Sequence, residues 1–236
     1  MARWPIVSLD REPVALSWSG GKDSALALAA LREDPRLEVV ALMTSVTREY
    51  DRISIHGVRR VLLEAQVASA GLPLIEVTLE PQCSNEAYEA AFFDAVARMR
   101  VGHPGVETLA FGDLFLEDVR AYREALLRRA GLTGCFPLWG RETRQLAHDF
   151  VARGFVAHLA CVDTTQLAAR FAGRVFDDGL IAELPAGVDP CGERGEFHTF
   201  VSAGPVFAQP IAVSCGDVVL RDGRFAYCDI LPSPAG

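Results

Sequence analysis

The sequence predicts an α/β protein in which a doubly wound parallel sheet is followed by a second, smaller α+β domain. Short apolar segments alternate with helix-like segments through about the first 134 residues. A glycine-rich loop stands between the first apolar segment and the first helix-like one. From about Cys135 onward this alternation gives way to turn-rich connections and a hairpin signal.

The first strand is expected in PVALSWS, an apolar segment of the length of a buried strand. The segment SALALAALRED, after the loop, is rich in alanine and leucine and contains no glycine or proline, which favours a helix. Further strands are expected in LEVVALMTSV, LPLIEVTL and VETLAFGDL. Further helices are expected in HGVRRVLLEAQVASAG, which stops at Gly71, in NEAYEAAFFDAVARMRVG with Asn85 as N-cap, and in LEDVRAYREALLRRAG. This alternation predicts parallel strands with helices on both faces.

The smaller domain is expected to begin after Gly134, so that residues 1–134 form one domain and residues 135–236 the other. CFPLWGRET is a turn-rich connection, TRQLAHDFVARG a helix and VAHLACVD a strand. PIAVSCGDVVLRDGRFAYCDIL has the pattern of two strands around a turn at Asp222-Gly223. Strands and helices no longer alternate regularly here, which indicates an α+β arrangement.

The composition is that of a folded globular protein, since 50% of the 236 residues are hydrophobic and 23% are charged. The formal net charge of −8 argues against broad nucleic-acid binding, which depends on neutralising phosphates. The six cysteines include no C-x-x-C pair, which argues against a zinc ribbon and a disulfide framework. No uncharged apolar run of ~18 residues occurs, so no membrane span is expected. The N-terminus lacks the apolar core of a signal peptide, and we therefore expect the protein in the cytoplasm.

The glycine-rich loop, SGGKDS, has the features of a phosphate-binding loop. Backbone N–H groups at the start of a helix point toward a bound anion, and the helix dipole favours negative charge there. Gly20 and Gly21 can adopt conformations closed to other residues and allow an oxyanion to approach closely. Lys22 adds a positive charge, while Ser19 and Ser24 supply hydroxyl groups.

Two common phosphate-binding patterns do not fit this loop. A Walker-type loop with Gly21-Lys22 as its GK pair would need glycine at Leu16 and a hydroxyl residue at Asp23. The dinucleotide pattern G-x-G-x-x-G is also absent. A plain strand-to-helix turn with a capping serine stays open as the alternative interpretation.

Ligands of open parallel sheets bind beyond the carboxyl ends of the strands. Three stretches are expected at that edge: Ser19–Ser24, the residues near Thr44–Arg48 including Ser45, and Gly112-Asp113. Asp113 stands at the predicted strand end and is a candidate site residue. Two nearby acids, Glu117 and Asp118, are equally explained as helix N-terminal residues that complement the dipole.

A second unusual stretch, AGVDPCGERGEFHTFV, crowds Asp189, Glu193 and Glu196 together with Cys191 and His198. Carboxylates this close repel one another unless they bind a cation or share protons. Such a loop could hold a metal, an ammonium ion or an amine donor. A zinc site is disfavoured, because one cysteine and one histidine at this spacing match no standard ligand pattern. An ordinary acidic surface loop is the alternative.

The SGGKDS loop resembles the SGGxDS pyrophosphate loop of the N-type ATP pyrophosphatases, the PP-loop superfamily. Five stretches occur in the order SGGKDS, RISIHGVRRVLLEAQ, FGDLFLED, PLWGRET and DPCGERGEFHTFV. Together they are similar to the diphthine–ammonia ligase family, and the resemblance covers residues from Val14 to about Phe207. The first motif is shared with many pyrophosphatases, whereas the last is much more specific to this family. The resemblance implies a HUP-like, Rossmann-type fold for the first domain.

The resemblance also implies a reaction. ATP is cleaved between its α and β phosphates, a carboxylate is adenylated, and ammonia then displaces AMP to give an amide. In this family the acceptor is diphthine on a translation elongation factor. Asp23 beside the phosphates fits a Mg²⁺ ion that bridges them, and is the expected metal ligand.

The family pattern assigns residues to both substrates. The expected ATP-binding residues are Ser19, Gly20, Gly21, Lys22, Asp23, Ser24, Ser45, Gly112 and Asp113. The expected catalytic residues are Lys22, Asp23, Glu193, Glu196 and His198, of which the last three serve ammonia or the acceptor. His56 and Trp139 lie in family motifs, but the pattern gives them no definite role.

One residue departs from the family pattern. Arg194 stands where asparagine is expected in CGENGEFHTF. A positive charge between Glu193 and Glu196 would weaken ammonium recruitment or bring in an anionic substrate. The acceptor is therefore left open between diphthine and another carboxylate.

Two other functions use the same kind of loop. A tRNA-modifying enzyme is disfavoured by the acidic chain and its dispersed cysteines. An ATP-sensing module without chemistry is disfavoured by Asp23 and the acidic loop, neither of which simple nucleotide binding requires. The oligomeric state is also open, and a homodimer is compatible with such folds.

Overall fold

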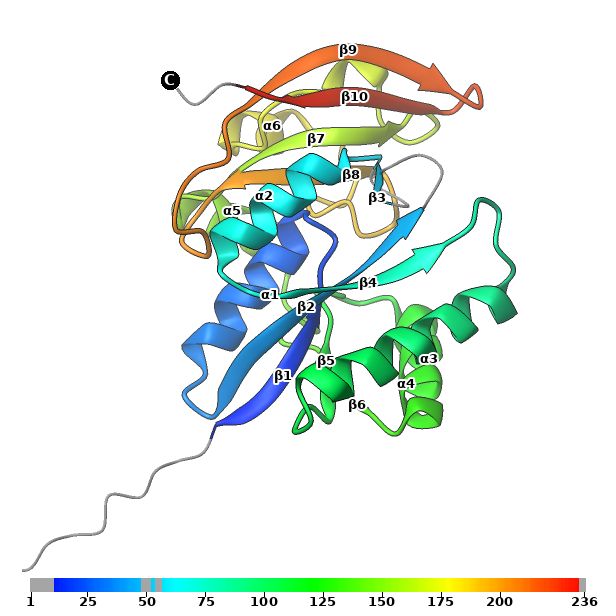
Figure 1. Ribbon diagram of the computed structural model, residues 1–236. Coiled ribbons are helices and arrows are strands. Elements are labelled where there is room, and N and C mark those ends of the chain that lie inside the picture. The colour runs from blue at the N-terminus through cyan, green and yellow to red at the C-terminus, as the bar shows by residue number, and fades with distance from the viewer. Residues whose placement is uncertain (1–10, 48–51, 54–56, 234–236) are drawn as a thin grey trace, which may run out of the picture.

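The computed structural model describes residues 11–47, 52–53 and 57–233. It contains a mainly parallel sheet with helices on both faces and a separate antiparallel sheet (Figure 1). This confirms the predicted combination of an α/β unit and a smaller α+β unit. His56 and Arg48, named above, lie outside the described residues.

Five parallel strands form the first sheet in the order β4-β2-β1-β5-β6. Their bounds are β1 Glu12–Ser17, β2 Leu37–Thr47, β4 Leu74–Leu79, β5 Thr108–Ala110 and β6 Thr133–Cys135. A sixth strand, β3 (Arg52–Ile53), pairs antiparallel with the end of β2. The strand order reverses between β1 and β5, which is where such sheets bind ligands.

The helices cover both faces of this sheet because side chains alternate along each strand. On β1, Val14 and Leu16 pack in one core cluster with α1 (Lys22–Glu33) and α2 (Arg60–Ala70). Ala15 packs in the other, with α3 (Asn85–Gly102) and α4 (Glu117–Ala130). The sheet is thus doubly wound, as predicted.

Two of the predicted helix ends can be compared directly with the structure. Gly71 ends α2 in the left-handed conformation with φ of 68°, as expected of a glycine stop. Asn85, by contrast, is wrong as the N-cap of α3. Ser84 takes that position, since its side chain accepts a hydrogen bond from the Ala87 amide at 3.2 Å. A hydroxyl serves this purpose as well as an amide oxygen.

The second sheet has the order β8-β7-β10-β9 and is antiparallel. Its strands are β7 Val156–Asp163, β8 Phe197–Ala203, β9 Val213–Arg221 and β10 Phe225–Pro232. The turn between β9 and β10 contains Asp222 and Gly223, with φ of 52° and 62°, which confirms the predicted hairpin. The accompanying helices are α5 Thr143–Ala152, α6 Asp178–Glu183 and the 3₁₀ turn η1 Ala169–Phe171.

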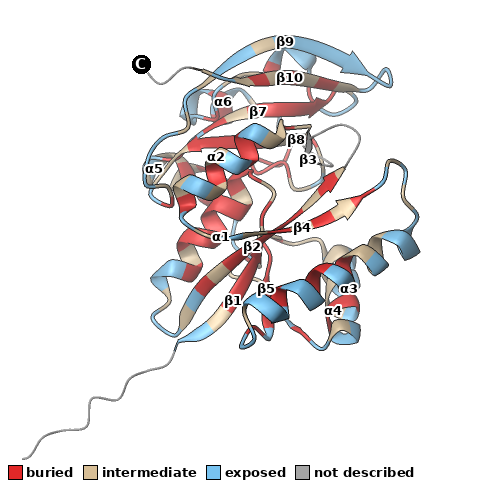
Figure 2. Ribbon diagram, viewed as in Figure 1, coloured by how far each residue is buried: buried red, intermediate tan, exposed pale blue. Residues whose placement is uncertain are grey.

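Helix α1 lies between the two sheets and contacts both β2 and β8 (Figures 1 and 2). Because it is covered on two sides, it is apolar nearly all round, which explains its run of alanine and leucine. One core cluster extends from the parallel sheet through α1 to the aromatic side chains of the second domain. This packing brings β8 to the start of α1, where the glycine-rich loop lies.

No helix in the described ranges is long and apolar enough to cross a membrane.

Candidate active site

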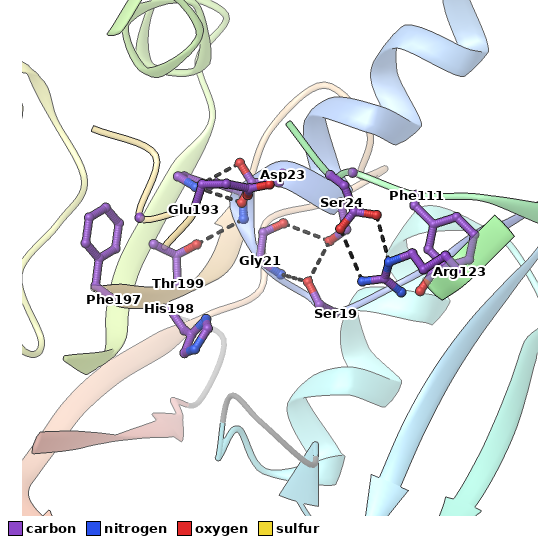
Figure 3. Close-up of a pocket in the computed structure, with 15 residues that line it drawn as sticks. Ser19, Gly21, Asp23, Ser24, Phe111, Arg123, Glu193, Phe197, His198 and Thr199 are labelled. Carbon is purple, nitrogen blue, oxygen red and sulfur yellow. Dashed lines mark hydrogen bonds and ion pairs between the residues drawn. The ribbon is translucent and has the colours of Figure 1, made fainter. Parts of the chain in front are cut away.

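A cavity of about 220 Å³ lies at the start of α1, where β1 and β5 end. It receives residues from both domains (Figure 3). Its lining consists of Ser17, Ser19, Gly21, Lys22, Asp23, Ser24, Phe111, Gly112, Asp113, Arg123, Gly192, Glu193, Phe197, His198 and Thr199. Most of the predicted site residues are therefore brought together here, although they lie as far apart in the sequence as residues 19 and 198.

The two loop glycines are needed for different reasons. Gly20 adopts a left-handed conformation with φ of 78°, which disfavours any side chain. Gly21 is extended, with φ of −91° and ψ of 176°, a conformation open to every residue. A Cβ at Gly21 would lie 3.0 Å from the Thr199 carbonyl oxygen, so the close approach of β8 explains this glycine. The predicted special conformation thus applies to Gly20 and not to Gly21.

The loop is held from behind by Gln66, a fully buried residue of α2. Its Nε2 donates to the carbonyl oxygens of Gly20 at 2.9 Å and Val201 at 2.6 Å. Its Oε1 accepts from the Trp18 indole at 3.1 Å. The Val201 amide also donates to the Gly20 carbonyl, at 2.9 Å. Gln66 therefore ties the loop to Trp18, which follows β1, and to β8.

The sequence interpretation gave Gln66 no role, but a signal was present. Gln66 follows Leu62 and Leu63 by four and three residues and precedes Ala70 by four, and all three are buried on α2. It is thus a polar residue on the apolar face of an amphipathic helix. A residue with that placement must find buried hydrogen-bond partners.

Replacing Gln66 with leucine is expected to lower the free energy of unfolding by about 1–3 kcal/mol, because buried donors and acceptors lose their partner. Nucleotide affinity should fall as well, since the loop loses its support. Thermal melts and calorimetry with an ATP analogue measure both effects. Gln145→Leu, at an exposed position of α5, is the matched control. Equal melting temperatures of the Gln66→Leu and Gln145→Leu variants would contradict the supporting role of Gln66.

Two of the loop amides are already used within the protein. The Gly21 amide donates to Ser19 Oγ at 3.3 Å and the Lys22 amide to Thr199 Oγ1 at 3.0 Å. In the described part of the chain, the amides of Asp23 and Ser24 have no acceptor. The first turn of α1 therefore offers these two N–H groups to an anion.

Lys22 and Asp23 form an ion pair inside the cavity, with Nζ at 2.8 and 2.7 Å from the two carboxylate oxygens. The Lys22 side chain is only 2% exposed and that of Asp23 is 29% exposed. Burial by itself lowers the pKa of Lys22, but the negative charge of Asp23 and its hydrogen bond, together with the effects of Cys191 and Glu193, outweigh burial, so the pKa lies above its ordinary value. Burial raises the pKa of Asp23 against the opposing charge of Lys22.

A second ion pair, between Asp113 and Arg123, borders the cavity. Arg123 Nε lies 2.8 Å from Asp113 Oδ2, and the guanidinium carbon lies 4.4 Å from the centre of the Phe111 ring. Burial raises the pKa of Asp113, while the charge of Arg123 opposes this. Arg123 was missed by the sequence interpretation, because nothing in a helix rich in arginine marks the one that faces the site.

Glu193 and His198 reach the cavity from the second domain (Figure 3). Glu193 Oε1 accepts a hydrogen bond from the Leu114 amide at 2.8 Å, which ties the acidic loop to the segment after β5. Burial raises the pKa of Glu193 to about 7, although the Leu114 amide opposes this. Burial, with a smaller effect of the Lys22 charge, lowers the pKa of His198 to about 4. At neutral pH the imidazole is uncharged, and Glu193 is able to exchange a proton.

Glu196, by contrast, is absent from the cavity lining. It is 1% exposed and accepts the amides of Asp189 and Arg194, each at 2.9 Å. Asp189 accepts the Cys191 amide and the Thr143 hydroxyl, at 2.8 and 2.9 Å. Amides of the loop and the Thr143 hydroxyl of α5 thus stabilise these two carboxylates, which need no bound cation for this. Across the described residues, no group of three His, Cys, Asp or Glu side chains suits a metal ion.

A larger apolar cavity, of about 480 Å³, borders the first one and shares Ser17, Ser19, Phe111 and Arg123 with it. Of its lining, the sequence predicted Ser19 and Ser45 as ATP-binding residues and placed Thr44 at the same edge of the sheet. Its other lining residues are Trp18, Met43, Thr44, Val77, Leu79, Asn85, Tyr88, Phe92, Leu109, Val119 and Tyr122. Such a mostly apolar chamber beside an anion site suits a planar base attached to phosphates.

Trp139 lies in neither cavity. Its ring is 6.0 Å from the Phe136 ring and 4.6 Å from the Arg120 guanidinium carbon. Trp139 therefore packs against Phe136 and Arg120 and stabilises the segment after β6.

Residues 12–134 match the family model of the diphthamide synthase N-terminal domain, and residues 142–230 match that of the diphthamide synthase C-terminal domain. The chain belongs to the diphthamide synthase family. It is similar to a protein of Schizosaccharomyces pombe described as diphthine–ammonia ligase, with 26% identity over 230 residues. The aligned region is 90% of this chain and 38% of that relative, so the chain spans well under half of the relative's length.

In this diphthamide synthase family member, the two matched regions meet at the cavity. Lys22 and Asp113 come from the N-terminal match, whereas Glu193 and His198 come from the C-terminal match. The contact between Glu193 and the Leu114 amide crosses between them. The cavity is therefore complete only when both are present.

Proposed function

We propose that this family member is an ATP-dependent, amide-forming ligase that adenylates a carboxylate, releases pyrophosphate and amidates the carboxylate with ammonia. One observation carries the proposal. The glycine-rich loop lines a single cavity together with Glu193 and His198, and this cavity adjoins an apolar chamber of about 480 Å³. An anion-binding loop and a group able to accept a proton near neutral pH are thereby brought together.

In this proposal the base of ATP lies in the apolar cavity and its phosphates lie along the loop. The amides of Asp23 and Ser24 donate to phosphate oxygens, and Lys22 and Arg123 supply positive charge. These donors are held in place before ATP arrives, by Gln66 and β8. Preorganised donors stabilise developing negative charge more effectively than water does.

A magnesium ion fits this arrangement as a companion of ATP. Magnesium sites beside phosphates use one or two carboxylates and complete their coordination with phosphate oxygens and water. Asp23 meets that requirement, because it lines the cavity and its side chain is 29% exposed. When bound, the ion would neutralise part of the phosphate charge.

In the first step an oxygen of the acceptor carboxylate attacks the α phosphorus. The new P–O bond gives an acyl adenylate, the bond between the α phosphorus and its bridging oxygen breaks, and pyrophosphate leaves with the electron pair. Lys22 and the amides of Asp23 and Ser24 hold the departing charge. No residue of the chain forms a covalent intermediate.

In the second step ammonia attacks the acyl carbon. A C–N bond forms, the C–O bond to AMP breaks, and AMP leaves with the electron pair. The proton lost by the nitrogen passes to the Glu193 carboxylate, whose pKa of about 7 suits a general base. Glu196 is assigned a positioning role, because its hydrogen bonds to the amides of Asp189 and Arg194 shape the loop that presents Glu193.

Amide formation is expected to increase as the pH rises through about 7, because only ionised Glu193 accepts a proton. Glu193→Gln should lose this dependence while keeping the contact with the Leu114 amide. Stability changes in the opposite direction. Native Glu193 keeps its proton up to about pH 7, whereas the unfolded chain releases it near the ordinary value of 4.5. The wild type therefore loses stability relative to Glu193→Gln as the pH rises between these values.

Melts of both proteins from pH 5 to 8, together with a ¹³C carboxyl titration of labelled glutamate, check this prediction. Parallel stability curves for the two proteins would contradict it.

The proposed function is tested by product analysis. The purified protein is incubated with α-labelled ATP, Mg²⁺, ammonium and a cell extract that supplies acceptors, beside an Asp23→Asn variant whose folding is checked by its melting curve. We expect labelled AMP and pyrophosphate from the wild type, and a strong loss in the variant. Omitting ammonium should allow adenylation but no amide.

Two outcomes would contradict the proposal. Release of ADP in place of AMP would exclude α–β cleavage. ATP that binds but stays intact with every extract fraction would favour an ATP-sensing module.

A further inference from the structure

A third cavity, of about 310 Å³, lies beside the phosphate-binding one, and His198 lines both. The rest of its wall belongs to the second domain: the ends of β7 and β10 and the turn that carries Arg194 and Gly195. We call it the basic cavity, after Arg194 and Arg224 in its lining. Adjacent residues of one loop thus line two cavities: Glu193 lines the phosphate-binding cavity, and Arg194 lines the basic cavity.

The one aspartate of the basic cavity is already paired. Asp163 is 1% exposed and accepts hydrogen bonds from Arg224 Nε at 3.1 Å and Nη2 at 2.6 Å. Thr165 and Gln166 donate to it as well. The hydrogen bonds from Arg224 hold the pKa of this carboxyl below its usual range. Asp163 therefore stays ionised, and its charge is matched by Arg224.

Arg194 has no such partner. Its backbone amide is anchored on Glu196, and its guanidinium carbon lies 5.5 Å from the centre of the Phe115 ring. Among the residues that the structure describes, none offers the guanidinium group a carboxylate within ion-pair distance. Arg194 is exposed and lines the cavity, and no carboxylate of the described residues uses its guanidinium donors.

The other titratable groups of the lining are neutral near pH 7. Burial raises the pKa of Cys161 to about 11 and that of Tyr227 to about 12, and it lowers that of His198 to about 4. Two arginines and one carboxylate leave the lining with a net charge of +1, in a chain whose formal net charge is −8. The basic cavity is thus electrostatically unlike the protein as a whole, and it favours an anion.

We propose that the basic cavity holds the acceptor, and that the acceptor is a small carboxylic acid with a second anionic group, which Arg194 binds. This inference rests on the proposed function, because it identifies the acceptor class for that reaction. The reactive carboxylate lies toward His198 and the phosphate cavity, and the second anion pairs with the planar guanidinium. Arginine matches the geometry of a carboxylate or a phosphate with two parallel hydrogen bonds. A chamber of about 310 Å³ is at the small end for ligand sites, which favours a metabolite-sized acid.

Binding of defined probes to the full chain tests the proposal. The dianionic probes are succinate, glutarate, adipate and 3-phosphonopropionate, and the matched monoanions are butyrate, valerate and caproate. Affinities are measured by ligand-observed NMR, in the presence of a non-cleavable ATP analogue and Mg²⁺. Arg194→Asn removes the positive charge, and Arg144→Asn makes the same change at an exposed position of α5 outside the cavity.

At least one dianionic probe is expected to bind, and to lose about tenfold or more in affinity in Arg194→Asn but not in Arg144→Asn. The matched monoanion should bind the wild type about as weakly as the dianion binds Arg194→Asn. A tighter response to the phosphonate than to the dicarboxylates would identify the second anion as a phosphate-like group. The proposal is overturned if no dianionic probe binds, or if all bind Arg194→Asn as they bind the wild type.

AMP formation in the same samples, with ammonium and true ATP, is a separate readout. Loss of AMP formation with intact Arg194-dependent binding would count against the proposed reaction and leave the anion site standing. AMP formation from an acceptor whose binding is independent of Arg194 would support the proposed reaction and would overturn the anion site at Arg194.

Discussion

Replacing Lys22 with methionine is expected to reduce AMP formation by about 10²–10³-fold, because the departing pyrophosphate loses a preorganised positive charge. The substitution also leaves Asp23 without its cation, so the free energy of unfolding should fall by about 1–3 kcal/mol. Both carboxylate oxygens of Asp23 contact Lys22 Nζ, which makes this loss direct. Activity is measured as labelled AMP and stability by urea unfolding.

A double variant separates the two effects. Lys22→Met combined with Asp23→Asn removes the unpaired buried charge, and we expect most of the lost stability to return while AMP formation stays at or below the low level of Lys22→Met. Recovery of activity together with stability would show that Lys22 serves folding alone. The pair is suited to this test because its members contact each other at 2.7 Å.

Gly112→Ala is expected to have the second large effect. A Cβ at this position would lie 2.8 Å from the backbone carbonyl carbon and oxygen of Asp23, and 3.1 Å from the Ser24 amide nitrogen. Backbone atoms cannot move aside as a flexible side chain can. The end of β5 must therefore separate from the first turn of α1, and we expect a loss of about 1–3 kcal/mol in stability. Nucleotide affinity should fall with it, since the same turn supplies the amides of Asp23 and Ser24.

Gly102→Ala is the matched control, because the space beside Gly102 is open and its φ is not positive. Melting curves and calorimetry with an ATP analogue compare the two variants. If Gly112→Ala binds and melts as Gly102→Ala does, the close packing of β5 on α1 does not shape the site.

Local sequence signals were sufficient for most of the fold. The alternation of apolar strands and helices predicted the parallel sheet, and the Asp222-Gly223 turn predicted the hairpin of the second domain. Both were predicted from signals that lie within short stretches of sequence, which a pattern reports directly. The choice of Asn85 over Ser84 as N-cap was wrong because either side chain suits that position.

The site was harder to predict, since one loop contains residues with different surroundings. Glu193 and Glu196 stand three residues apart in the same motif, yet only Glu193 lines the cavity, and Glu196 faces backbone amides. Arg123 is one of several arginines on α4, and only its contact with Asp113 distinguishes it. These differences arise from what each side chain contacts in the folded chain, whether in its own domain or in the other one.

Local patterns in the chain were enough to predict the α/β class, the glycine-rich anion loop and the acidic second motif, because glycine placement, helix starts and apolar periodicity are local properties. The packing of β8 against the loop, the hydrogen bonds from Gln66 to the loop, and the placement of Arg194 in a different cavity from Glu193 are visible only in the folded protein. Such contacts join residues that are distant in the sequence: Gln66 and Gly20 are 46 positions apart, and Lys22 and Thr199 are 177 positions apart. They follow from the packing of α1 between two sheets, which no local pattern specifies.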